Sequence, residues 1–416
     1  MRFLPHKRRL HARSSGSARD FASILCGQFG TVNTLHTENL AMIARQPFPF
    51  RADHVGSLLR PAQLAHAREA YAQGQMPATS LHEIEDSVIV DAVRRQEDLG
   101  MPVVTDGEFR RSYWHLDFLT SLSGVRRTKP TLVAQFRTCE GPVPMEAHGL
   151  EVTGKIERSA PIFVEHFRFL KHVARGTPKI TIPSPSILHF RGGRAAIDSD
   201  AYPDLDSFFA DLAGVYRAEI HDLGAAGCEY LQIDDTNFAY LCDPGIREQV
   251  RSRHAIEPDH LARLYARLIN DSIRERPSNM KVMLHVCRGN FRSAWAAEGG
   301  YEPVADILFN EVAVDGYFLE FDDARSGDFS PLRHLPKGKI ATLGLITSKT
   351  GALETTDSVK RRIEAASRFA PLEQLALSPQ CGFASTCEGN AVSADDQWRK
   401  LKLVSDIASE VWAGNG

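Results

Sequence analysis

Eight short apolar runs, rich in β-branched residues, alternate along the chain with segments of helical spacing. Most of the runs are continuously apolar, which is typical of strands that are buried on both faces. Strands that alternate with helices predict parallel βα units. The eight expected strands cover residues 52–58, 102–107, 178–183, 229–234, 280–286, 315–321, 338–345 and 375–380.

Polar residues and glycines mark where the helices between these runs should begin and end. Ser80 and Glu83 have the spacing of a capping box, and Gly100 is expected to end the helix that follows them. The last helix is expected to begin after Ser393. Further helices are expected over 205–226, 257–276 and 357–369.

Eight βα units in one chain predict the α/β class and, within it, a closed (β/α)8 TIM barrel. The structural alternative is an open doubly wound sheet, but no GxGxxG motif follows the first expected strand. Residues 110–177 are too many for one unit, so we expect an insertion after strand two. A basic turn at Arg126, Arg127 and Lys129 precedes two strand-like stretches in it, 131–138 and 149–157. They predict a hairpin over the barrel mouth, either a substrate cover or a surface decoration.

Residues 1–46 differ from the rest of the chain. The first 41 carry six Arg or Lys and two acidic residues, without periodicity and without the apolar region of a secretory signal. We expect a disordered extension, or a start placed upstream of a natural one at Met42; an organelle-targeting peptide is the alternative. The domain that carries the fold is expected to cover 47–416.

The composition excludes several classes of protein. With 416 residues, 43% hydrophobic and 24% charged, the chain has ordinary globular usage and is not a mostly disordered protein. A net charge of -3 gives no reason to expect nucleic acid or a membrane as partner. Seven scattered cysteines argue against a disulfide scaffold and for a reducing compartment, the cytoplasm. A homo-oligomer stays open.

Reactive side chains follow six of the eight expected strands. In a barrel the active site lies at the carboxyl ends of the strands. Six such coincidences are hard to explain by packing alone, so we expect the functional site at this end. The residues are His54, Ser57, Asp106, Glu108, Asp234, Asp235, His285, Cys287, Glu320 and Cys381.

Four of these residues form a candidate metal site. His285 and Cys287 are two positions apart on one strand, so both point to the same face. Cys381 and Glu320 follow other strands and are candidates for the same point. Two thiolates, an imidazole and a carboxylate suit tetrahedral Zn²⁺, and sulfur ligands disfavour Mg²⁺ or Ca²⁺. Buried structural cysteines are the alternative, and Cys387 is a second-choice ligand.

Several motifs, in their order along the chain, resemble the catalytic C-terminal barrel of the cobalamin-independent methionine synthase family. The most specific are His-Val-Cys at 285–287, Leu-Glu at 319–320 followed by Arg-Ser at 325–326, and Ser-Pro-Gln-Cys-Gly at 378–382. The resemblance covers about residues 48–414 and is greatest to the short, single-barrel members.

This resemblance implies an enzyme similar to 5-methyltetrahydropteroyltriglutamate–homocysteine S-methyltransferase. Such an enzyme moves a methyl group to the thiol of homocysteine and forms methionine. The resemblance implies that Glu108 and Asp234, which we count as catalytic, hold the ammonium group of homocysteine and that Ser57 holds its carboxylate. It also implies a zinc ion with four ligands, namely His285, Cys287, Glu320 and Cys381.

Departures from the family pattern concern the methyl donor. A Gly-Pro and a tryptophan of the pterin site are replaced within 183–190, and Thr-Ser-Lys at 347–349 stands where a histidine is expected. The donor therefore stays open between a methyl-folate and another methyl compound. An amine leaving group needs a proton, and Lys349 or His189 is expected to supply it. Arg288 and Arg325 are expected to hold an anionic group, although Arg325 has a structural alternative, bracing its own loop.

Trp114 and His115 follow the second strand and are candidates for the mouth of the site, with surface exposure as the alternative. Three other functions also stay open. They are alkyl transfer to another small thiol, as in coenzyme-M epoxide transferases, a uroporphyrinogen-decarboxylase-like barrel, and a degenerate barrel that stores or senses zinc or thiols. The acid pair Glu108 and Asp234 argues against the first, and the complete candidate ligand set argues against the other two.

Overall fold

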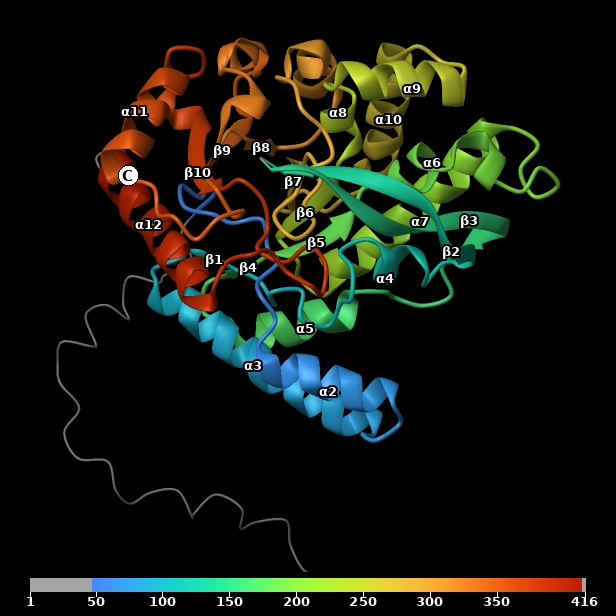
Figure 1. Ribbon diagram of the computed structural model, residues 1–416, viewed down its shortest axis with the longest axis horizontal. Helices are drawn as coiled ribbons and strands as arrows, with labels where there is room; N and C mark the ends of the chain where they lie inside the picture. The colour runs from blue at the N-terminus through green and yellow to red at the C-terminus, as the bar shows by residue number, and fades with distance from the viewer. Residues whose placement is uncertain (1–46, 139, 414–416) are drawn as a thin grey trace, which may run out of the picture. The chain divides into compact units, whose positions relative to one another are not determined.

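The computed structural model describes residues 47–138 and 140–413. Six parallel strands form its central sheet in the order β10-β9-β8-β7-β6-β5 (Figure 1). Every residue of these six strands is buried except the first residue of β7. This burial agrees with their continuously apolar sequences. The strands are β5 (Ile180–Pro183), β6 (Tyr230–Asp235), β7 (Lys281–Val286), β8 (Gly316–Glu320), β9 (Ile340–Ile346) and β10 (Leu375–Pro379).

Parallel pairing continues beyond both ends of this sheet. At one end Ala52 forms a single parallel bridge to Leu377 of β10. At the other end β4 (Thr177–Pro178), which Lys179 alone separates from β5, pairs in parallel with β1 (Val103–Val104). All eight expected strand regions therefore take part in parallel pairing.

The first two regions are much less regular than the sequence predicts. Only Ala52 and the two residues of β1 pair as strands in the predicted ranges 52–58 and 102–107. Gly56 at φ 131° and Gly107 at φ 65° interrupt the extended backbone there, since neither conformation belongs to a strand. The backbone instead bends toward the carboxyl ends of the neighbouring strands, where Ser57 and Glu108 lie.

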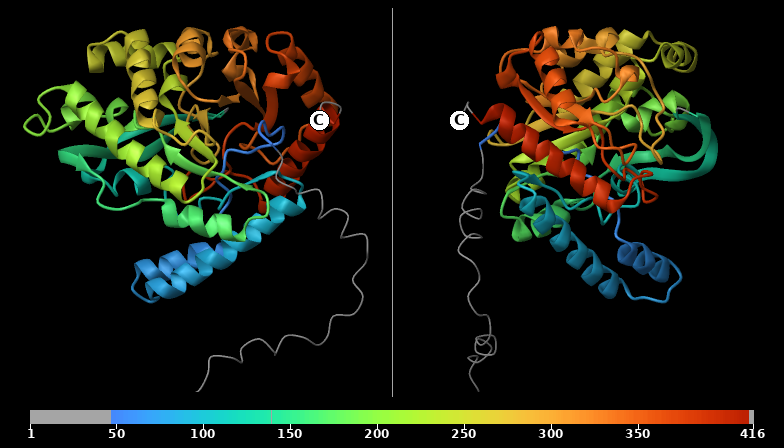
Figure 2. Two further views of the ribbon diagram at one scale, coloured as in Figure 1. Left: turned by 180° about the vertical axis from the view of Figure 1, so that it is seen from behind. Right: turned by 60° about the vertical axis from the view of Figure 1, so that its left-hand side comes forward.

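Helices cover the outside of the strands (Figures 1 and 2). The largest apolar cluster joins strand residues such as Ile233 and Leu284 to helical residues such as Leu212 and Ile269. None of the described helices is long and apolar enough to cross a membrane. The longer helices are α2 (Ala62–Ala72), α3 (Ala78–Asp98), α5 (Val164–Val173), α7 (Leu205–Ala225), α9 (Pro244–His254), α10 (Pro258–Ile273), α11 (Thr356–Ser367) and α12 (Ala394–Trp412). The four-residue helices are α4 (Leu116–Leu119), α6 (Ile187–Phe190) and α8 (Asn237–Tyr240).

The structure confirms the predicted start of α12 but not the predicted start of α3. Ser393 caps α12 in a reciprocal capping box with Asp396. The capping box predicted at Ser80 is wrong, because α3 already begins at Ala78, directly after Pro77, and has no side-chain cap. Gly100 follows the end of α3 with φ 81°, as predicted.

A second apolar cluster gathers side chains from seven of the parallel regions. It lies apart from the cluster beneath the helices and also includes Phe50. Its strand and bridge-region members are Val55, Val103, Tyr230, Met283, Phe318, Ile340 and Ala376. From β4–β5, Lys179 adds its ammonium group over the rings of Phe318 and Tyr230. The parallel strands therefore have one face toward the helices and one toward a core of their own.

A long antiparallel hairpin separates β1 from β4 in the sequence. It consists of β2 (Ser123–Thr138) and β3 (Gly141–Glu157). The prediction of a basic turn at Arg126, Arg127 and Lys129 is wrong. These exposed residues lie within β2, where Arg126 and Arg127 pair with Glu151 and Leu150 of β3. Near the hairpin tip, Arg137 pairs with Trp295 in the loop after β7.

Candidate functional site

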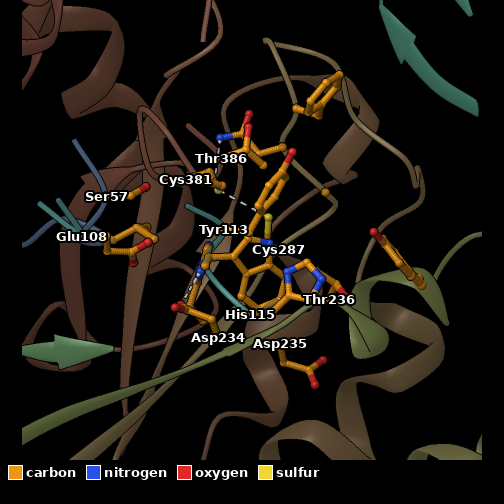
Figure 3. A pocket seen from close by; sticks show the side chains of 18 of the residues that line it. Ser57, Glu108, Tyr113, His115, Asp234, Asp235, Thr236, Cys287, Cys381 and Thr386 are labelled. Carbon is orange, nitrogen blue, oxygen red and sulfur yellow. Dashed lines mark hydrogen bonds and ion pairs between the residues drawn. The ribbon is translucent and has the colours of Figure 1, made fainter. Parts of the chain in front are cut away.

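A cleft of about 640 Å³, its open mouth included, lies at the carboxyl ends of the strands. It is the place where the sequence predicts the functional site. Predicted site residues that line it are Ser57, Glu108, Asp234, Cys287 and Cys381 (Figure 3). His285 lines it as well. Asp235 also lines the cleft, but Ser186 and the backbone of Phe238 occupy its two oxygens.

His285, Cys287 and Cys381 form a compact cluster at the cleft. One ligand atom of each lies within 4.8 Å of the others, and all three side chains are buried. The Sγ atoms of Cys287 and Cys381 are 3.3 Å apart (Figure 3). β7 supplies His285 at its end and Cys287 directly after it, while Cys381 follows β10. Two sulfur atoms and an imidazole at this spacing are a donor set that fits Zn²⁺.

The imidazole of His285 presents a single free nitrogen to this cluster. Its Nδ1 lies 3.0 Å from Asp234 Oδ1, whereas its Nε2 is buried and has no hydrogen-bond partner among the described residues. A metal-binding histidine has this arrangement, because a carboxylate on one nitrogen fixes which nitrogen binds the ion. The orphaned Nε2 therefore supports a metal at the cluster.

The electrostatics of the three side chains favour one thiolate. The hydrogen bond from Cys287, together with His285, outweighs burial and lowers the pKa of the Cys381 thiol to about 5. That hydrogen bond and burial raise the pKa of Cys287. Burial alone would lower the pKa of His285, but Asp234 and Cys381 raise it to about 10. Such mutually stabilised charges are typical of a site that exchanges protons for a cation.

Glu320, the fourth predicted ligand, lies at the end of β8 but outside the three-residue cluster. Its side chain is fully buried, and Oε1 accepts a 2.7 Å hydrogen bond from the backbone N–H of Arg288. Burial alone would raise the pKa of Glu320, but the cations of Lys349, Arg325 and Arg288 lower it. The carboxylate is thus kept ionised beside the residue that follows Cys287.

Those three cations do not line the cleft, in contrast to their predicted roles toward substrate or donor. Arg288 donates to Tyr301 Oη and Gly299 O. Arg325 contacts Glu320, Asp322 and Asp323. These contacts fit the structural alternative for Arg325, which is that it braces its own loop. Lys349 Nζ lies 3.3 Å from Asn290 Oδ1, behind the cleft wall. The cations instead offset the buried negative charge of Glu320, a need that their sequence positions do not reveal.

Glu108 is held in a strained position at the cleft. Its backbone is left-handed, at φ 59°, and its N–H donates to Asp106 Oδ1. Oε1 accepts a 2.9 Å hydrogen bond from Thr181, while Oε2 is buried without a partner among the described residues. Burial and the nearby Asp234 raise the pKa of Glu108 to about 7, against the opposing effect of Arg111. Arg111 and Thr181 contact only Oε1, Arg111 Nη1 at 3.7 Å, and an acid with a free oxygen in a strained conformation is typical of a ligand site.

Ser57 lies against Gly382, on the same side of the cleft as Glu108 (Figure 3). A Cβ added to Gly382 would overlap Ser57 Oγ, so the glycine makes room for the hydroxyl. The backbone N–H of Phe383 donates to Ser57 O, which ties the loop after Cys381 to the first parallel region. The Ser-Pro-Gln-Cys-Gly motif therefore positions Ser57 as well as Cys381.

Some predicted residues are not brought to the cleft. Nδ1 of His189 forms a 2.8 Å hydrogen bond with Tyr265 Oη, and the imidazole packs against Phe209. His189 does not line the cleft. Cys387 is exposed and lies outside the His-Cys-Cys cluster. His54 is buried away from the cleft wall, where burial and Lys179 lower its pKa to about 3.

Other cleft residues carry little or no sequence signal. Trp114 and His115 line the cleft as one of their two sequence interpretations predicts, and His115 is buried there. Arg191 was not predicted, although it directly follows 183–190, the stretch that departs from the family pattern. The remaining aromatic wall comes from Tyr113, Phe136, Tyr240 and Phe291. These residues come from five separate segments, so only the folded chain brings them together.

Comparison with known proteins identifies the family of this chain. The model of the family described as cobalamin-independent synthase, catalytic domain, matches residues 50–404. The uncharacterized protein YxjH of Bacillus subtilis is 46% identical over 88% of this chain and 95% of its own length. The methionine synthase of Pyrococcus abyssi is 26% identical over 79% of this chain and 84% of its own length.

A solved structure has a similar fold. The crystal structure of a putative vitamin-B12 independent methionine synthase from Listeria monocytogenes is 36% identical and superposes with a TM-score of 0.70. The match covers 88% of this chain and 99% of that one. Together with the family match over 50–404, this similarity confirms the family that the sequence motifs indicate. The chain belongs to the cobalamin-independent methionine synthase family.

Proposed function

We propose that this protein is a zinc-dependent S-methyltransferase that moves a methyl group to the thiol of homocysteine and forms methionine. In the reaction, a carbon–sulfur bond forms between the thiolate and the methyl carbon while the bond from that carbon to the donor breaks, and the donor leaves with that electron pair and takes up one proton from solvent. The thiol proton leaves to solvent before transfer. The donor is a methyl-folate or another small methyl compound.

One observation carries this proposal. The His285, Cys287 and Cys381 cluster opens into the same cleft as Glu108 and Asp234. Two sulfur ligands beside a histidine suit zinc, and two carboxylates suit the ammonium group of an amino acid. A thiol amino acid has both of these functional groups, which makes homocysteine the proposed acceptor.

Zinc bound at this cluster would lower the pKa of a coordinated thiol, so that the nucleophilic thiolate is present at neutral pH. We assign His285, Cys287 and Cys381 as ligands, with Glu320 as the fourth. Glu320 suits this role because it is ionised and its Oε1 accepts from the N–H of the residue next to Cys287. Because both cysteines must stay reduced to bind zinc, we propose the cytoplasm as the compartment.

The chain's own residues would hold the rest of homocysteine. Glu108 Oε2 has no partner among the described residues, so it is available to accept from the ammonium group. Asp234 lines the same cleft and is fixed in place by Gln232, which donates to its Oδ1 at 2.7 Å. Ser57 Oγ faces the loop after Cys381, where it is available to the carboxylate. These groups would orient the sulfur toward the donor and so lower the entropic part of the barrier.

We also propose that the eight parallel regions close into a (β/α)8 barrel, with the hairpin as an insertion. Two observations support this. The pairing extends past β10 to Ala52 and past β4 to β1. The backbone N–H of Leu58 donates to Gly107 O, and Thr105 Oγ1 donates to Gly56 O, so the two outermost regions contact each other.

Zinc content and sulfur coordination test the proposed function. The full chain is purified under reducing conditions, as wild type, Cys381→Ser and the exposed-cysteine control Cys387→Ser. We expect one zinc per chain in the wild type and the control, and a loss in Cys381→Ser. Homocysteine should then add one sulfur ligand in X-ray absorption at the zinc edge.

Other outcomes would contradict the proposal in different ways. Zinc without an added sulfur from homocysteine would point to another thiol, as in the coenzyme-M type of reaction. Absence of zinc under reducing conditions would reject the methyltransferase and favour the decarboxylase-like or non-catalytic alternatives.

A further inference from the structure

His115 and Arg191 form a polar pair in the wall of the cleft, and neither residue has a role in the proposed function so far. His115 precedes α4 and is 5% exposed, while Arg191 directly follows α6 and is half-buried. Nη1 of Arg191 lies 3.3 Å from Nε2 of His115. Both residues line the cleft that holds the His-Cys-Cys cluster. Figure 3 shows His115 and Thr236 on the opposite side of Cys287 from Ser57 and Glu108.

The contact with Arg191 fixes where the imidazole of His115 carries its proton. A guanidinium nitrogen only donates hydrogen bonds, so Nε2 of His115 must accept. In the neutral ring the proton then lies on Nδ1. Burial and the charges of Arg191 and Arg127 lower the pKa of His115 well below its usual value, which keeps the ring neutral.

The resulting Nδ1–H donor has no acceptor among the residues that the structure describes. Nδ1 of His115 is buried and lacks a hydrogen-bond partner among residues 47–138 and 140–413. A buried polar atom without a hydrogen-bond partner is uncommon in folded proteins, because it loses its bonds to water and gains none in return. An acceptor atom of a bound molecule would satisfy it.

Arg191 adds an uncompensated positive charge at the same place. Within the described part of the chain, no carboxylate lies within ion-pair distance of its guanidinium. The one hydrogen bond of its side chain to a described residue goes to the acceptor nitrogen of His115, which holds the guanidinium without neutralising it. The charge of Arg191 and the donor of His115 therefore both favour an anionic acceptor.

The surroundings of the pair favour a flat ligand. The ring centroid of Trp114 lies 4.7 Å from that of His115, and the tilted rings of Phe136 and Phe291 have centroids 5.8 Å apart. All of them, together with Tyr240, line the cleft. Aromatic walls around one charged contact are typical of sites for planar organic anions.

We propose that His115 and Arg191 form a second subsite, which binds the anionic group of an aromatic ligand through Nδ1–H and the guanidinium. The anion is a carboxylate or a phosphate. Given the proposed function, on which this assignment of the ligand rests, the occupant is the methyl donor. The subsite then determines donor specificity, and the donor is an aromatic compound with an acidic substituent.

Small aromatic probes test this subsite on the zinc-loaded full chain by calorimetry. Benzoate and phenyl phosphate carry the two candidate anions, and benzamide is the neutral counterpart of benzoate. We expect at least one anion to bind tenfold or more tightly than benzamide, and the tighter of the two to identify the group. Equal binding of benzoate and benzamide, or no binding of either anion, would overturn the proposal.

Variants locate the binding. Arg191→Gln should weaken the preferred anion at least tenfold, whereas Arg267→Gln, which removes an exposed charge on α10, should not. His115→Phe keeps a ring beside Trp114 but removes the donor, and it gives a second test if Arg191→Gln does not fold. It should also lose anion affinity. Unchanged affinity in either folded variant would contradict the assignment.

The same wild-type sample separates this proposal from the proposed function. Homocysteine binding with no anion binding would overturn only the second subsite. Anion binding that depends on Arg191, without homocysteine binding, would overturn the methyltransferase and leave the subsite established.

Discussion

Nδ1 of His285 lies 3.0 Å from Oδ1 of Asp234, and the two residues are direct partners in the parallel pairing of β7 with β6. The register of two buried strands therefore decides which nitrogen of His285 faces the sulfur atoms. The same carboxylate lines the cleft where we place the ammonium group of homocysteine. Asp234 thus connects the proposed metal site to the proposed amino-acid site.

The first prediction concerns this connection. Asp234→Asn should lower zinc affinity by about 10- to 100-fold, because the amide no longer fixes and polarises the ligating imidazole. Competition against a chromophoric zinc chelator measures the affinity. Asp91→Asn, an exposed change on α3, is the matched control and should leave it unchanged. Equal zinc affinity in both variants would contradict the role of Asp234.

The second prediction concerns the pH dependence of stability. The pKa of Glu108 is raised from 4.5 to about 7 in the folded protein, chiefly by burial. Between these values the folded state binds more protons than the unfolded state. The free energy of unfolding should therefore fall as the pH rises through this window, and the loss should be complete above about 7.

Glu108→Gln removes this dependence, because a glutamine cannot ionise. Urea unfolding of the zinc-free, ligand-free protein at pH 5 and pH 8 measures it. The wild type should lose more stability than the variant between the two pH values, while the variant binds homocysteine more weakly at pH 8. Parallel pH profiles for the two proteins would show that Glu108 is not the titrating group.

The third prediction concerns the room that Gly382 leaves for Ser57. In Gly382→Ala the new Cβ would overlap Ser57 Oγ and force the hydroxyl to rotate. We expect weaker homocysteine binding together with a loss of stability. Adding Ser57→Ala removes the clash, so the double variant should regain stability but not affinity. A double variant as unstable as Gly382→Ala would place the strain elsewhere.

The fourth prediction concerns a buried ion pair among the parallel strands. Lys179 Nζ lies 2.8 Å from Asp53 Oδ1, and both side chains are at most 1% exposed. Tyr230 Oη donates to the other oxygen of Asp53. Removing one charge leaves the other buried and unpaired, so Lys179→Met should cost about 3–5 kcal/mol of unfolding free energy.

The double variant Lys179→Met with Asp53→Leu should recover part of this loss, since no lone charge remains. Lys402→Met, which removes an exposed partner of Asp406, should cost at most about 1 kcal/mol. Chemical denaturation of the three variants makes the comparison. A similar small cost at both lysines would show that Lys179 is solvated in solution.

The sequence by itself determined the order of the parallel strands and the residues at their carboxyl ends. Burial on both faces leaves a local signal in each strand, so β5 to β10 lie where the apolar runs predict them. The two-residue spacing of His285 and Cys287 is equally local, and it places both in the cluster. The family motifs then indicated Cys381 as their partner.

Only the tertiary structure decided which of the polar side chains meet. Arg288 and Arg325 are arginines beside predicted ligands in the sequence, but the fold directs them to Tyr301 and to the acids near Glu320, because that buried carboxylate needs counter-charge. His115 and Arg191 are 76 residues apart, and their contact depends on how two loops pack at the cleft. Hydrogen bonds between distant segments leave no periodic or local pattern. The sequence could therefore predict where the candidate site lies and the three residues of its His-Cys-Cys cluster, but not the cation cluster around Glu320 or the second polar pair in the cleft.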